Sequence, residues 1–254
     1  MAYLLKDLTY QPWIGGKLMN NNEHSISQSQ AATIAGTSLL LMTVLAGFAY
    51  GFVFESLVDL SDAETTVRNI NTSGLLFRFG IFSWVLILML DVLVAWSLYI
   101  YFKPVNKSIS LLAAWFRLIY SSFLGVSLLG FVVVLLLLDD AFLGMFEADQ
   151  MNRLVMLSLM GFQNIWSIGL IIAGVHLLLL AYLVFKSGYI PKIWAILLLL
   201  ASLGYMLTNV GQLVLPQYGD YKAIVEAILV VPMIVGEVGF AIWLLWRGAR
   251  IKGL

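Results

Sequence analysis

The chain has 254 residues, of which 61% are hydrophobic and only 11% are charged, and its mean hydropathy is +0.96. This balance lies far outside that of soluble domains and predicts a protein of the lipid bilayer. Fourteen Lys and Arg balance fourteen Asp and Glu, so no overall basic field exists to attract nucleic acid, and a nucleic-acid partner is excluded. The absence of cysteine excludes disulfides, thiolate nucleophiles and cysteine-based metal sites.

Six apolar runs are each long enough to cross about 30 Å of hydrocarbon, which takes about 20 helical residues. In chain order they cover residues 31–54, 75–102, 108–138, 154–185, 193–215 and 223–246. We therefore expect an all-α integral membrane bundle of six transmembrane helices over residues 31–247. It is flanked by a cytoplasmic or interfacial N-terminal tail over 1–30 and a cytoplasmic C-terminal tail over 248–254.

The loop charges predict the orientation, because Lys and Arg are retained on the cytoplasmic side of a membrane. Nine cations fall on the side that holds both termini, and three fall on the other side. The nine are Lys6, Lys17, Lys103, Lys107, Lys186, Lys192, Arg247, Arg250 and Lys252, and the three are Arg68, Arg153 and Lys222. Both termini should therefore be cytoplasmic.

Four ionisable residues inside the apolar runs fall at one depth. Asp91, Arg117, His176 and Glu237 each lie ten to twelve residues from an inner-face cation, which at about 1.5 Å per residue is close to the membrane midplane. An ionised residue there costs about 2.5 to 3.5 kcal/mol, so these groups should face inward and find partners. We expect an ion pair between Asp91 and Arg117, on consecutive antiparallel helices, and a second pair between His176 and Glu237, whose helices need not be neighbours.

A second polar set extends from this layer toward the outer face. Its members are Arg78, Gln163, Asn164, Ser202, Tyr205, Asn209 and Gln212, of which the last four share one face of the fifth helix. Together these residues predict a polar cavity that begins at the midplane and opens outward. The alternative interpretation is that both sets only form hydrogen bonds between helices.

Two other patterns in the apolar runs point to packing. Gly47 and Gly51 match the GxxxG pattern, which we interpret as packing of the first helix within the bundle. The tryptophans at 84, 96, 115, 166, 194, 243 and 246 are interpreted mostly as interfacial anchors or lipid-facing bulk. We expect no metal ion and no cofactor.

Several segments resemble the bacterial domain-of-unknown-function 4386 family. They are residues 76–81 followed by Asp91, residues 103–107 with Arg117, residues 175–191, and Gly236-Glu237 with residues 243–245. The resemblance covers about residues 33–247. One departure is Thr33, which stands where an Arg before Ile-Ala-Gly is expected, so no role of that Arg carries over. The resemblance implies a multi-pass protein of the bacterial cytoplasmic membrane and no particular activity.

Three functions compete on these observations. The first is the binding or carriage of a small amphiphile or membrane lipid in the outward-opening cavity, with the midplane layer as its polar floor. The second is an accessory or structural subunit that assembles with other membrane protein subunits. The third is proton-coupled transport, with Glu237 as proton carrier and His176 as relay, although no inverted repeat is evident. Enzymatic activity is the least favoured, and we predict no catalytic residue.

Overall fold

The computed structural model describes residues 26–141, 144–215 and 217–250, and within residues 219–246 it describes the side chains of 229, 231 and 233–246. This part of the chain contains helices and turns and no strand, which confirms the all-α class. Residues 1–25 of the predicted N-terminal tail and 251–254 of the predicted C-terminal tail lie outside the described residues.

Among the described residues, five helical stretches are long and apolar enough to cross a membrane. They are Gln28–Leu57, made of α1 (Gln28–Ala46), the π-helical η1 (Gly47–Phe54) and α2 (Glu55–Leu57); α4 (Gly74–Phe102); Lys107–Leu137, made of α5 (Lys107–Ser127) and α6 (Leu129–Leu137); α7 (Ala148–Ser187); and α8 (Lys192–Val214). The sixth predicted run falls on the 28-residue helix α9 (Gly219–Trp246). Two short helices, α3 (Ala63–Thr72) and η2 (Gly248–Arg250), complete the fold.

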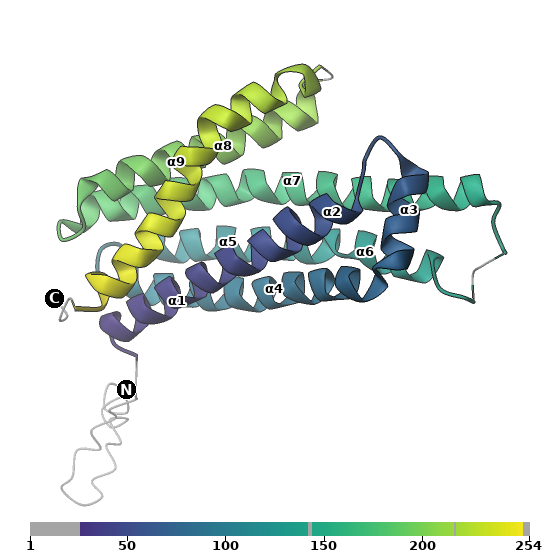
Figure 1. The fold of residues 1–254 in the computed structure, drawn as a ribbon. Helices are drawn as coiled ribbons and strands as arrows, with labels where there is room; N and C mark the ends of the chain where they lie inside the picture. The colour runs from purple at the N-terminus through teal and green to yellow at the C-terminus, as the bar shows by residue number, and fades with distance from the viewer. Residues whose placement is uncertain (1–25, 142–143, 216, 251–254) are drawn as a thin grey trace, which may run out of the picture.

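The long helices form a closed ring. Each packs against the next in the order α1, α4, α5, α7, α8 and α9, and α9 packs back against α1 (Figure 1). The start of α1 lies beside η2 at one end of the bundle, where the Ser29 hydroxyl donates a hydrogen bond to the Ala249 carbonyl. The two ends of the described chain therefore lie together.

Apolar and polar residues are distributed in the reverse of a soluble protein. Large apolar side chains point outward, among them Val44 and Leu75, each 70% exposed, and Leu157, 67% exposed. Charged and polar side chains lie inside, including Asp91 and His176. A surface this apolar requires lipid or protein around it. The chain is therefore a multi-pass membrane protein.

A short polar connection sets α5 against α4 at the end that holds the termini. The Asn106 side chain caps α5 by accepting a hydrogen bond from the Ile109 amide at 3.0 Å. One turn further on, the Ser110 hydroxyl donates to the Tyr99 carbonyl of α4 at 2.9 Å. These two bonds fix the relative height of α4 and α5, and therefore of the charged residues that they carry.

The helix α3 is too short and polar for a span and was not predicted from the apolar runs. Asp62 caps it, accepting hydrogen bonds from the Thr65 amide at 3.0 Å and the Thr65 hydroxyl at 2.7 Å. Those bonds stabilise the carboxylate, so the pKa of Asp62 lies below its usual value. The helix packs beside the first turns of α7, at the end of the bundle away from the termini.

Close helix contacts in the ring depend on glycine at several interfaces. A Cβ added at Gly36 on α1 would lie 2.8 Å from the Ala241 carbonyl oxygen of α9, and one at Gly174 on α7 would lie 3.1 Å from the Ser202 carbonyl oxygen of α8. Gly47 and Gly51 differ, because a Cβ at either would meet no atom within 4 Å. The interpretation of this GxxxG pair as a packing motif is therefore wrong for the described part of the chain, in which no atom lies against either glycine.

Substitution should distinguish glycines at close helix contacts, such as Gly36, from glycines without such a contact, such as Gly47. Gly36→Ala should lower the free energy of unfolding by about 1 to 3 kcal/mol, because backbone at the α1–α9 contact must move. Gly47→Ala, its control on the same helical stretch, should change it by less than about 0.5 kcal/mol. Unfolding of the purified variants in detergent micelles measures both values, and equal losses would contradict this account of the α1–α9 contact.

Candidate functional site

The predicted ion pair between Asp91 and Arg117 is present at the centre of the bundle. The Arg117 Nη2 lies 2.7 Å from the Asp91 Oδ1, and the two residues are 6% and 0% exposed. They come from α4 and α5, the consecutive helices that the Asn106 turn holds in register. A buried pair of this kind keeps both groups ionised only because each compensates the other.

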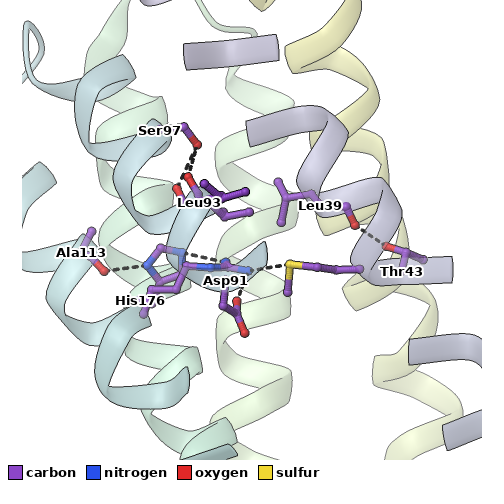
Figure 2. Close-up of polar contacts among 10 residues, drawn as sticks. Leu39, Thr43, Asp91, Leu93, Ser97, Ala113 and His176 are labelled. Carbon is purple, nitrogen blue, oxygen red and sulfur yellow. Dashed lines mark hydrogen bonds and ion pairs between the residues drawn. The ribbon is translucent and has the colours of Figure 1, made fainter. Parts of the chain in front are cut away.

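The third member of the layer, His176 on α7, joins this pair through Arg117. Its Nε2 lies 3.3 Å from the Arg117 Nη1, and its Nδ1 lies 2.8 Å from the Ala113 carbonyl oxygen (Figure 2). A guanidinium can only donate and a carbonyl can only accept, so Nδ1 carries the proton and Nε2 is an acceptor. His176 is therefore a neutral imidazole with both ring nitrogens in use.

Arg117 also reaches the first helix, because its Nη2 lies 3.8 Å from the Met42 Sδ on α1. One side chain thus contacts α1, α4 and α7 from its own position on α5. We call Asp91, Arg117 and His176 the charged cluster. Within the described part of the chain, the Asp91 Oδ2 has no hydrogen-bond partner although it is buried.

Glu237 on α9 is half-buried and, among the described residues, forms no hydrogen bond or ion pair with the charged cluster. The Tyr205 hydroxyl on α8 donates a hydrogen bond to its carboxylate. Of the described residues, no Lys, Arg or His forms an ion pair with it. The expected pair of His176 with Glu237 is therefore not formed, because each of the two groups has a different partner.

These groups border a cavity of about 520 Å³, which we call the central cavity. Arg117, His176, Tyr205 and Glu237 line its polar part, whereas Asp91 lies behind Arg117 and does not reach it. The remaining wall is largely apolar and aromatic and is contributed by α1, η1, α4, α5, α7, α8 and α9. The four predicted midplane residues are thus brought to one place, three of them at the cavity surface.

A smaller cavity of about 180 Å³, the side cavity, adjoins the central one. The two share five lining residues, Tyr50, Trp166, Leu170, Tyr205 and Met233. Among the predicted outer polar residues, Gln163, Tyr205, Asn209 and Gln212 line the side cavity. The Ser167 hydroxyl donates to the Asn209 Oδ1 at 2.8 Å and orders this polar edge.

Three other members of the predicted outer polar set lie elsewhere. The Ser202 hydroxyl donates to the Gly174 carbonyl at 2.7 Å and ties α8 to α7. Asn164 is exposed and donates to the Met160 carbonyl of its own helix at 2.9 Å. Arg78 is exposed on α4 and lines neither cavity. Counting residues along a helix does not predict the direction in which each of these side chains points.

The aromatic lining was missed from the sequence. Trp84 is only 2% exposed and Trp166 lines both cavities, so the interpretation of tryptophans as anchors or lipid-facing bulk is wrong for these two. It holds for Trp115 and Trp246, which are 58% and 60% exposed. A usable signal was present, because Trp84 lies two helical turns before Asp91 and therefore on the same helix face.

The charged cluster generates a stability prediction. Arg117→Gln should destabilise the protein by about 3 to 5 kcal/mol, because it leaves the Asp91 carboxylate buried without compensation. The double variant Asp91→Leu with Arg117→Met should lose much less than Arg117→Gln alone, because it removes both charges. Unfolding in micelles compares them, and a double variant at least as unstable as Arg117→Gln would contradict a simple charge-compensation role.

Comparison with known proteins places the chain in a family. The family described as domain of unknown function 4386 matches residues 34–248. A protein of Archaeoglobus fulgidus described as uncharacterized is 33% identical over 173 residues, which cover 68% of this chain and 84% of that protein. No solved structure matches. The match begins within α1 and covers the rest of the ring, and the chain belongs to the domain-of-unknown-function 4386 family.

Proposed function

We propose that the chain crosses the bacterial cytoplasmic membrane six times, with both termini in the cytoplasm, and that residues 31–247 form its membrane domain between the tails 1–30 and 248–254. The position of α9 in the ring and the meeting of α1 with η2 support an even number of crossings. The excess of Lys and Arg in the loops at that end supports the orientation.

We further propose that the protein binds or carries a small amphiphile or lipid in the central cavity. The single observation behind this proposal is a space of about 520 Å³ that is mainly apolar and aromatic but also has Arg117, His176 and Glu237 in its lining. Ligand sites typically have volumes of about 300 to 1,000 Å³, apolar walls and a few convergent polar groups. A molecule with one polar end and one apolar end matches this division.

A lateral opening between η1 and α9 gives such a molecule a route from the bilayer. Gly47 and Gly51 line the central cavity, and both residues are exposed. On the facing side, Ile234 of α9 lines the cavity and is 55% exposed. The wall of the cavity is therefore continuous with the lipid-facing surface at this gap.

The two alternative functions receive less support from the site. A proton relay through His176 would need at least one of its bonds to Arg117 and Ala113 to break, since both ring nitrogens are in use. An accessory subunit would use the exposed apolar surface to pack against partner chains, but lipid covers such a surface equally well. We therefore place amphiphile binding first and the accessory role second.

Filling the lateral opening tests the proposal without touching the charged cluster. Gly47→Leu should abolish the retention of bound small molecules, because its side chain occupies the cavity wall where no atom lies within 4 Å. Gly161→Leu is the matched control, because a Cβ there also meets no atom and the residue lines neither cavity. Native mass spectrometry of protein extracted gently from its own membrane measures the bound mass.

The expected result is a discrete bound amphiphile in the parent and in Gly161→Leu that is lost in Gly47→Leu. Equal retention in both variants, or no bound molecule in the parent, would contradict cavity binding. A stoichiometric partner chain in place of a small molecule would move the accessory-subunit function to first place.

A further inference from the structure

We propose that the central cavity selects amphiphiles with a cationic head, an amine or a quaternary ammonium, and holds that head between Glu237 and a cluster of aromatic rings. This inference rests on the proposed amphiphile binding and adds the chemical class of the ligand. It follows from the charges that border the cavity and from the rings that form its wall.

The first step is the charge that the cavity leaves uncompensated. The Arg117 guanidinium is matched by the Asp91 carboxylate at 2.7 Å, so this pair contributes no net charge. His176 is a neutral imidazole, because its two nitrogens face one acceptor and one donor. Glu237 remains as a carboxyl group with a hydroxyl partner and with no cation paired to it among the described residues.

An anionic head fits the central cavity poorly, because the Arg117 Nη1 and Nη2 already have partners within the protein. Its Nη1 is directed to His176, and its Nη2 is shared between Asp91 and Met42. An anion would have to compete with the Asp91 carboxylate and would also lie in the cavity that Glu237 borders. Repulsion between an anionic head and the ionised form of Glu237 would oppose that arrangement in a low-dielectric site.

The second step is the aromatic wall. The Trp166 ring lies with its centroid 5.1 Å from that of Trp84 and 5.4 Å from that of Tyr50, at interplanar angles of 71° and 55°. Tyr120 and Tyr205 line the same cavity. Rings set at large angles to each other present several faces to one space, and ring faces attract ammonium groups most strongly where water is excluded.

The third step is the position of the tail. Met233 and Ile234 on α9 line the central cavity together with Gly47 and Gly51 on η1, and Ile234 and both glycines are exposed. A hydrocarbon chain can therefore extend from the aromatic wall through the opening into the bilayer. A ligand held in this way needs only a compact head and a single chain.

The experiment compares two probes of equal chain length, decyltrimethylammonium and decyl sulfate, by titration calorimetry of the purified full-length protein in uncharged maltoside micelles. The cation should bind about tenfold or more tightly than the anion, as expected for a desolvated ammonium over aromatic faces. Glu237→Gln keeps an oxygen acceptor for Tyr205 and should remove most of this preference by weakening cation binding alone. Equal affinities of the two probes would overturn the inference.

A second pair of variants tests the rings should Glu237→Gln fail to fold. Tyr50→Leu keeps an apolar side chain and should weaken cation binding several-fold without changing sulfate binding, whereas Tyr50→Phe keeps the ring and should change neither. No difference between the Leu and Phe variants would overturn the aromatic part of the site.

The Gly47→Leu variant separates failure of this inference from failure of the proposed function. If Gly47→Leu blocks both probes but the parent binds them equally, the cavity binds amphiphiles and only the selectivity is overturned. If neither probe is affected by Gly47→Leu, binding does not occur in the cavity and both proposals fail.

Discussion

The buried guanidinium of Arg117 is the group on which the interior of this bundle depends. It contacts Asp91 on α4, His176 on α7 and Met42 on α1, so one side chain on α5 links three other helices at a single depth. A charge in this position cannot be left without compensation in a lipid environment. The heights of α4, α5 and α7 are therefore coupled, and the short capped turn at Asn106 supplies the register that the ion pair needs. Once those helices are fixed, α8 and α9 close the ring around a space that side chains do not fill.

Much of this arrangement could be predicted from the sequence because the bilayer imposes simple rules. Backbone groups in hydrocarbon must bond within the helix, so apolar length predicted the long helices, and five helical stretches among the described residues are long and apolar enough to cross a membrane. Helix rise placed Asp91, Arg117, His176 and Glu237 at one depth, and antiparallel neighbours predicted the first ion pair. What counting cannot supply is the rotation of each helix about its axis and the order of helices around the ring. These decide that His176 turns to Arg117 and Ala113 while Glu237 turns to Tyr205, and that Arg78 and Asn164 face outward.

The aromatic wall could not be predicted for the same reason, because the rotation of each helix and the order of the helices were unknown. Trp84 and Trp166 share their helix faces with Asp91 and His176, but a tryptophan in an apolar run is equally suited to lipid. Only the closure of the ring places them inside, against Tyr50 from the first span and against each other. The polar residues that tie α7 to α8, such as Ser202 and Asn209, perform the structural role that interhelical hydrogen bonds often have. Hydrogen bonds that join helices and residues that line a cavity thus occur in one bundle, on different faces of the same helices.

The π-helical stretch η1 explains why the wall between α1 and α9 is open at one end and closed at the other. Before it, Gly36 lets α1 approach α9 closely; within it, the wider i→i+5 turn changes which side chains face the bundle. Its inward face is held by Val53 against Gly80 of α4 and by Tyr50 against Trp166 of α7. Gly47 and Gly51 are both exposed, and no atom of the described residues would lie within 4 Å of a Cβ at either. Regular α-helix through this segment would continue the α1–α9 contact, whereas π-helical turns, which frequently mark functional sites, end it at the level of the cavity.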